Sequence, residues 1–140
     1  MDRGARARRS GFVPAQAAEN VFIKNGAAVS GYDVIAYFDE GKPRKGTAEF
    51  QSTYKGAVYR FSSEENLSKF AANPSAYAPQ YGGHCAWAAA NNYLADGNPN
   101  YWRIVDGKLY LNYNGSVQRK WEKDIPGFIT KADANWPGLK

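Results

Sequence analysis

Alternating apolar and polar residues predict three β-hairpins, each centred on a turn dipeptide. The paired segments are 21–24 and 27–30 around Asn25-Gly26, 50–54 and 57–61 around Lys55-Gly56, and 102–105 and 108–113 around Asp106-Gly107. Asn-Gly and Asp-Gly readily supply the positive φ angles that a two-residue hairpin turn requires. The aromatic residues of the second hairpin alternate as in a sheet with one covered face: Phe50, Tyr54, Tyr59 and Phe61.

Apolar residues at helical spacing predict short helices between and after the hairpins. Asp33 is placed to cap a brief helix that ends near Gly41, and Ser62 or Ser63 is placed to cap another that ends before Pro74. Segments 117–125 and 128–136 each carry one apolar face and predict two C-terminal helices. Short antiparallel hairpins packed with short helices give an α+β fold class.

Length and composition limit the number of domains. The chain has 140 residues, 44% of them hydrophobic and 15% aromatic, which indicates one globular domain and excludes disorder of the whole chain. No apolar run approaches the roughly 18 residues of a transmembrane helix. We expect a basic arm or remnant signal segment over residues 1–18 and a single domain over residues 19–140.

The net charge of +5 is concentrated at the N-terminus. Four arginines and one aspartate give residues 1–10 a net charge of +3, which leaves +2 for the other 130 residues. A folded nucleic-acid-binding domain would be more basic, so we expect no specific nucleic-acid partner. Two partners stay open for the basic arm: lipid headgroups, through a peripheral contact, or another protein.

The first 20 residues have the basic start and the A-x-A pattern, at residues 15–17, of a secretory signal, but they lack its apolar middle. A mis-assigned start or truncated gene, a cloning remnant and a genuine basic arm all remain open. The first alternative favours an exported or periplasmic protein, and the third a cytoplasmic one. In an oxidising compartment, the single cysteine, Cys85, would be a free reactive thiol or an intermolecular link.

Residues 54–77 carry the pattern Y-x-G-x-x-Y-x-F-x-S, followed by F-x-x-x-P-x-x-Y. This pattern resembles the YHS domain. The flanking segments GYDVIAYF, YGGHCAWA, VDGKLYLNYN and KADANWP are similar to a bacterial, usually exported subfamily, so the resemblance covers about residues 27–137. It implies a treble-clef-like core followed by the two C-terminal helices.

Metal-binding YHS domains carry cysteines at two positions that are Ser62 and Asn66 in this chain. That thiolate pair is therefore absent. A structural zinc site needs about four nitrogen or sulfur ligands, and the chain has only one histidine and one cysteine. Residue count thus excludes a closed zinc site of this kind.

Cys85 is the candidate catalytic or reactive thiol, because we expect it in the first turn of a helix, where backbone N–H groups favour a thiolate. A protonated His84 beside it would lower the thiol pKa further. His84 and Cys85 also form a soft donor pair suited to copper or another soft transition metal, and Asp33 is a third candidate ligand. The alternatives are a core cysteine and an Asp33 that only caps a helix.

Two functions follow from these features. The first is binding or redox chemistry through a thiol or copper-like site at His84-Cys85, with a metal ion, oxidant or partner thiol as the ligand. The second is a non-catalytic interaction module or accessory subunit that uses its aromatic surface and the arginine-rich arm to bind a small molecule or protein. The sequence leaves open whether the protein is an enzyme.

Overall fold

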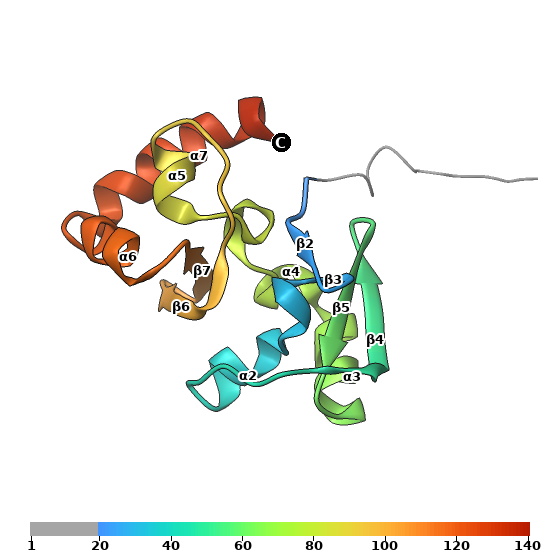
Figure 1. Ribbon diagram of the computed structural model, residues 1–140. Coiled ribbons are helices and arrows are strands. Elements are labelled where there is room, and N and C mark those ends of the chain that lie inside the picture. Colours follow the sequence, from blue (N-terminus) through green and yellow to red (C-terminus); the bar gives the residue numbers. More distant parts are fainter. Residues whose placement is uncertain (1–19) are drawn as a thin grey trace, which may run out of the picture.

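A computed structural model describes residues 20–140, an α+β fold in which three two-stranded antiparallel sheets accompany six α-helices (Figure 1). The fold class is as predicted. The hairpins are β2 (Ile23–Lys24) with β3 (Ala27–Ala28), β4 (Thr47–Tyr54) with β5 (Ala57–Phe61), and β6 (Asn98–Val105) with β7 (Lys108–Asn112). Each turns at its predicted dipeptide, and both residues of every dipeptide have positive φ angles.

Helices follow the hairpins in the predicted order. They are α2 (Val34–Asp39), α3 (Glu64–Ala72), α4 (Pro74–Tyr77), α5 (Ala86–Ala90), α6 (Gly115–Glu122) and α7 (Ile125–Leu139), with the 3-10 turns η2 (Val29–Gly31) and η3 (Gln80–Gly83). Asp33 and Ser63 accept the N-cap hydrogen bonds of α2 and α3. Because α6 and α7 close the chain, the two predicted C-terminal helices are confirmed.

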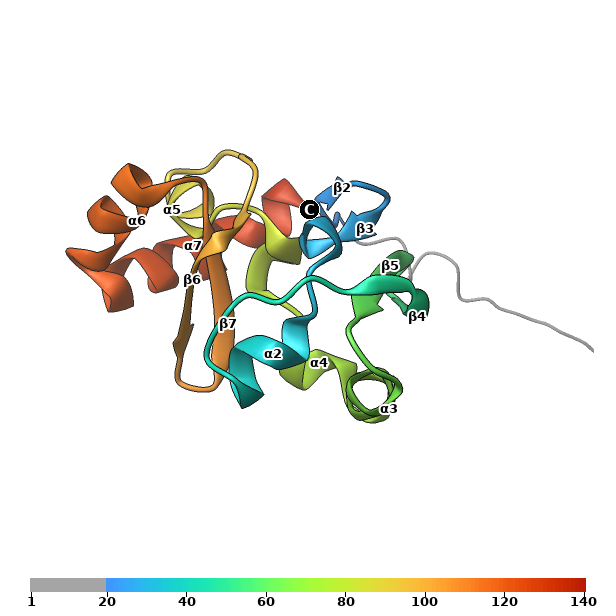
Figure 2. The same ribbon diagram turned by 60° about the horizontal axis from the view of Figure 1, so that its bottom comes forward.

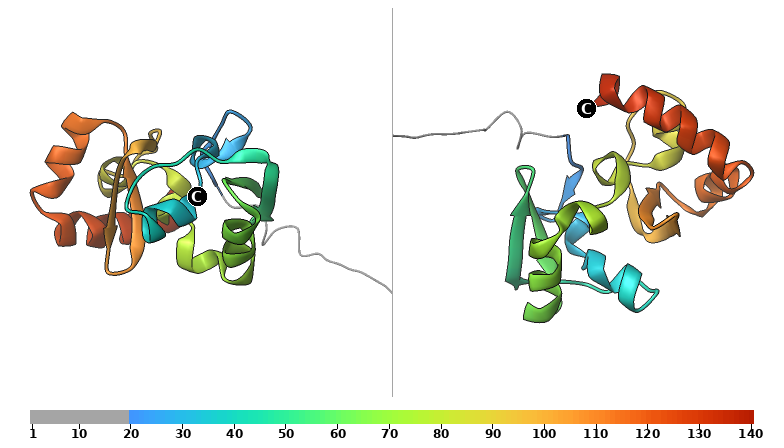
Figure 3. Two further views of the ribbon diagram at one scale, coloured as in Figure 1. Left: turned by 90° about the horizontal axis from the view of Figure 1, so that it is seen from below. Right: turned by 180° about the vertical axis from the view of Figure 1, so that it is seen from behind.

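Strand β7 lies between two hydrophobic cores. Leu109 and Leu111 pack in the first core, with residues of β3, η2, α2, β5 and α3. Tyr110, which points to the other face, packs in the second core with Tyr81, Trp121 and residues of α5 and α7. Figure 2 shows the β6–β7 hairpin between α2 and α6. Figure 3 shows from two further sides that α6 and the β4–β5 hairpin lie at opposite ends of the molecule.

The basic arm or remnant signal segment predicted over residues 1–18 lies outside the described residues. Within residues 20–140, no helix combines the length and the apolar character that crossing a bilayer requires. The longest helix among them, α7, has 15 residues.

Shortening a leucine of β7 should weaken the fold strongly. Leu111 is 1% exposed, so Leu111→Ala leaves a cavity in the first core, and we expect a loss of about 2–5 kcal/mol in the free energy of unfolding. Urea denaturation followed by tryptophan fluorescence measures this loss. Leu94→Ala is the control because Leu94 is 38% exposed, and it should change stability by less than about 0.5 kcal/mol. Equal effects of the two substitutions would contradict the role of β7.

Candidate functional site

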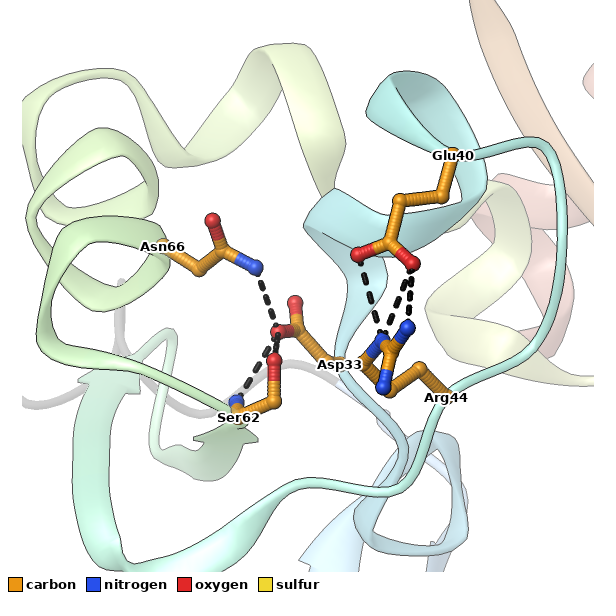
Figure 4. A network of polar contacts seen from close by, with 5 residues as sticks. All are labelled: Asp33, Glu40, Arg44, Ser62 and Asn66. Atoms are coloured by element: carbon orange, nitrogen blue, oxygen red, sulfur yellow. Dashed lines mark hydrogen bonds and ion pairs between the residues drawn. The ribbon is translucent and has the colours of Figure 1, made fainter.

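A buried carboxylate, Asp33, connects the start of α2 with the segment between β5 and α3 (Figure 4). Its Oδ1 accepts a hydrogen bond from Ile35 N at 2.9 Å, which is the predicted N-cap contact. Its Oδ2 accepts from Ser62 N at 2.9 Å, Ser62 Oγ at 2.8 Å and Asn66 Nδ2 at 2.8 Å. These donors offset the cost of burying a charged group.

The loop after α2 is hydrogen-bonded to the backbone of Asp33. Asp33 N donates to Arg44 O at 2.8 Å, and the Arg44 guanidinium binds the Glu40 carboxylate with a closest contact of 2.7 Å (Figure 4). The Arg44 and Glu40 side chains are 44% and 33% exposed, so this ion pair contributes little to stability. The buried hydrogen bonds of Asp33 therefore dominate this cluster.

Ser62 and Asn66, the positions at which the resemblance implies cysteines in metal-binding relatives, both donate to Asp33. Sequence analysis named these two residues for the missing thiols, and Ser62 also as a candidate helix cap, but it did not predict this contact; the cap of α3 is Ser63. Their only signal was that two small polar residues flank the predicted start of a helix. Asp33 Oδ2 would have to lose these donors before it bound a metal ion, and Oδ1 already accepts the N-cap hydrogen bond from Ile35 N.

His84 lies against the N-terminal end of the described chain. Its Nε2 is 3.0 Å from Asn20 Oδ1, and its ring lies 5.9 Å from that of Phe22 and 6.1 Å from that of Trp136, measured between centroids. Burial lowers the pKa of His84, and Asp96 and the backbone of Ala95 oppose this shift. The imidazole is thus held toward its neutral form, which cannot stabilise a neighbouring thiolate by charge.

Cys85 is the N-cap of α5 and lies just before its first turn. Cys85 N donates to Ala95 O at 2.8 Å, and its Sγ contacts Asn112 Oδ1 at 3.5 Å. The side chain is 1% exposed. Burial raises the pKa of the thiol and outweighs nearby backbone groups of Ala88, Tyr113 and Trp87, which lower it. The expected lowering of this pKa by the helix start is therefore wrong.

The three predicted ligands do not converge. His84 and Cys85 both have extended backbone angles, so their side chains leave the chain on different sides and meet different partners. Asp33 binds Ile35, Ser62 and Asn66 instead. Among residues 20–140, no three His, Cys, Asp or Glu side chains are grouped closely enough to hold a metal ion.

The elements around the first core form one half of the fold, and those around the second core form the other. A pocket of about 460 Å³ lies where these two halves meet. The β4–β5 hairpin contributes Tyr54, Lys55 and Tyr59, and β7 contributes Lys108. Its other residues come from the N-terminal segment, the region of α4 and η3, and α7: Val21, Ser75, Ala78, Pro79, Gln80, Tyr81, Gly82, Asp133, Trp136 and Pro137. Sequence analysis expected an aromatic binding face but did not place it.

Tyr81 is held in this pocket by an uncommon backbone conformation. It has a φ of 58°, in the left-handed region that few residues other than glycine adopt, and Gly82 and Gly83 follow with positive φ. Tyr81 Oη donates to Asp133 Oδ1 at 2.9 Å, and the Tyr81 ring lies 5.9 Å from that of Trp136. Burial and the hydrogen bond to Asp133 raise the Tyr81 pKa, so the hydroxyl stays protonated as a donor.

Comparison with known families now identifies part of the chain. Residues 35–81 match the family model of the YHS domain, so the chain contains a YHS domain that runs from α2 to Tyr81. Searches of curated proteins and of solved structures each gave no match. The likeness to a treble clef and the wider resemblance over residues 27–137 stay predictions.

Replacing the buried carboxylate by an amide should destabilise the protein. Asp33→Asn turns one acceptor oxygen into an NH2 group, which must face one of the backbone or side-chain donors. We expect a loss of about 2–4 kcal/mol in the free energy of unfolding. Asp39→Asn is the control, since Asp39 forms an exposed ion pair with Lys69 at 2.6 Å, and it should cost less than about 1 kcal/mol. Urea denaturation compares the two, and an Asp33→Asn variant as stable as the control would refute the role of Asp33.

The Cys85 thiol should react slowly in the folded protein. Because the side chain is buried and its pKa is raised, alkylation by iodoacetamide at pH 8 should be at least about tenfold slower than in the urea-unfolded chain. The rate for the folded protein should also increase over a higher pH range than the rate for the unfolded chain, because the thiol pKa is raised in the folded state. Mass spectrometry of timed samples measures both rates. A native rate equal to or above the unfolded one would instead establish a reactive thiol.

Proposed function

We propose that this protein is a non-catalytic binding domain whose ligand occupies the pocket between the β4–β5 hairpin and α7. The observation that carries this proposal is the pocket itself. Its volume of about 460 Å³ falls within the roughly 300–1,000 Å³ of small-molecule sites. It combines aromatic side chains with a few polar groups, as such sites usually do.

The residues of the pocket favour binding over catalysis. Its described lining contains neither histidine nor cysteine, and its one serine, Ser75, has its Oγ 3.5 Å from Asn73 Oδ1. An amide cannot take a proton from a serine, so Asn73 cannot act as the general base for this hydroxyl. The strained backbone of Tyr81 also supports a binding role, because such conformations gather at ligand sites.

A thiol or copper function at His84-Cys85 is the second candidate, and one observation favours it. Cys85 borders a further pocket of about 330 Å³, also lined by Trp87, Tyr93 and Tyr113, that leads to the thiol. The buried Nδ2 of Asn112 beside the thiol has no hydrogen-bond partner among residues 20–140. The low exposure of Cys85, the raised pKa of its thiol and the separate partners of His84 rank this candidate second. The alkylation rates decide whether it is pursued.

Export to the periplasm and contact with a partner or membrane through the basic arm stay proposals as well. Both rest on residues 1–18 of the sequence, and export rests also on the resemblance to a usually exported subfamily. The binding proposal depends on neither, since the pocket is lined entirely by residues between 21 and 137.

Blocking the pocket should abolish binding of an aromatic probe. We expect the fluorescence of 1-anilinonaphthalene-8-sulfonate, of its uncharged analogue N-phenyl-1-naphthylamine, or of both to increase on addition of the protein. Ser75→Trp places a large side chain at an exposed residue of the rim, and the increase should then be lost.

Ser116→Trp on α6 is the matched control, because Ser116 is also exposed but does not line the pocket. This variant should bind as the unmodified protein does. The proposal fails when neither probe binds, or when the two substitutions have the same effect.

A further inference from the structure

We infer that the pocket is selective for a small aromatic zwitterion, that is, a ring system that carries both an ammonium and a carboxylate group, as an aromatic amino acid does. This inference rests on the proposed function and adds the chemical class of the ligand. One cation and one anion of the lining carry it, because they face the same pocket without pairing with each other.

The cation is Lys108, the first residue of β7. Its side chain is exposed and forms no ion pair within residues 20–140. Side chains two residues apart on a strand share a face, so Lys108 lies on the face of Tyr110, whose ring centroid is 5.9 Å from that of Tyr81. The ammonium of Lys108 is therefore available to the carboxylate of a ligand.

The anion is Asp133 of α7, which is exposed at the same pocket. Its Oδ1 accepts the hydrogen bond of Tyr81 Oη at 2.9 Å, and it forms no ion pair with Lys108 or with any other residue in the described part of the chain. A carboxylate can accept several hydrogen bonds, so Asp133 can bind the ammonium of a ligand while it keeps its bond to Tyr81.

A ligand with a single charge would match one of these two residues and be repelled by the other. An acid is attracted by Lys108 but meets Asp133, and an amine meets the reverse arrangement. A ligand with both charges is complementary to both residues. Lys55, the third charged residue of the lining, already has contacts within the protein, among them one of its Nζ with the Tyr54 ring at 5.5 Å, and the match does not require it.

Aromatic rings supply the surface for the body of the ligand. Tyr81 and Trp136 are tilted by 64° with respect to one another, and Tyr54 and Tyr59 lie 6.3 Å apart between centroids on the hairpin side. Trp136 and Tyr54 are half-buried, so both keep surface that a ligand can contact. Rings prefer offset or edge-to-face contacts with other rings, which favours a planar aromatic ligand over a flexible aliphatic one.

Three ligands with the same phenyl ring test the inference. Phenylalanine carries both charges, 3-phenylpropionate lacks the ammonium, and phenethylamine lacks the carboxylate. Titration of each into the 15N-labelled full chain, followed by NMR, measures affinities down to the millimolar range. We expect phenylalanine to bind about twofold to fivefold more tightly than either analogue at low salt, which is the size that exposed ion pairs give, and this preference should decrease as salt increases.

Two substitutions should remove the two halves of this preference separately. Lys108→Gln should abolish the preference for phenylalanine over phenethylamine and leave that over 3-phenylpropionate. Asp133→Asn should do the reverse, since the amide oxygen can still accept the hydrogen bond of Tyr81 Oη. The matched controls, Lys123→Gln and Glu49→Gln, remove the same charges from exposed residues outside the pocket and should change neither preference.

The outcomes are distinguishable. Equal affinities of the three ligands, or no binding of phenylalanine to a protein that binds a naphthyl probe, would overturn the inference and leave the binding function standing. Equal weakening of phenylalanine binding by Lys108→Gln and Lys123→Gln would show a general surface attraction and would also overturn the inference. Failure of the proposed function is a different result, in which neither naphthyl probe binds to the unmodified protein.

Discussion

Strand β7 packs on both faces, and this double packing holds the molecule together. Leu109 and Leu111 enter the core of the YHS domain from outside the segment that the family model matches, while Tyr110 enters the core of the C-terminal helices. Because side chains alternate across a strand, a shift of β7 by one residue would exchange its leucines with its polar and aromatic residues. Neither core can therefore change its packing against β7 without the other.

Asp33 has a comparable role at a smaller scale. Its carboxylate joins the start of α2, the end of β5 and the first turn of α3 through hydrogen bonds to Ile35, Ser62 and Asn66. In metal-binding relatives, the resemblance implies thiolates at the positions of Ser62 and Asn66. A buried anion with several donors connects the same segments here, so this part of the fold does not require a metal ion to hold them together.

Features that depend on residues close together in the sequence were predicted correctly, and features that depend on distant segments were not. Hairpin turns such as Asp106-Gly107 and the cap of α2 at Asp33 depend on neighbouring residues, and they were predicted correctly. The burial of Cys85 was left open, because its partners come from other segments of the chain: its backbone N–H donates to Ala95 O, and its Sγ contacts Asn112 Oδ1. The pocket could not be placed for the same reason, since its walls come from segments between residues 21 and 137.

The pocket lies between elements of the two cores, with the β4–β5 hairpin on one side and α7 on the other. Tyr81 marks this junction: it is the last residue of the YHS match and also a member of the second core. Its backbone is left-handed, with a φ of 58°, and its hydroxyl donates a hydrogen bond to Asp133 of α7. A ligand that contacts both Tyr54 and Trp136 would bridge the β4–β5 hairpin and α7. Such a ligand would stabilise the whole chain and not one half, since it binds only when both are folded and joined.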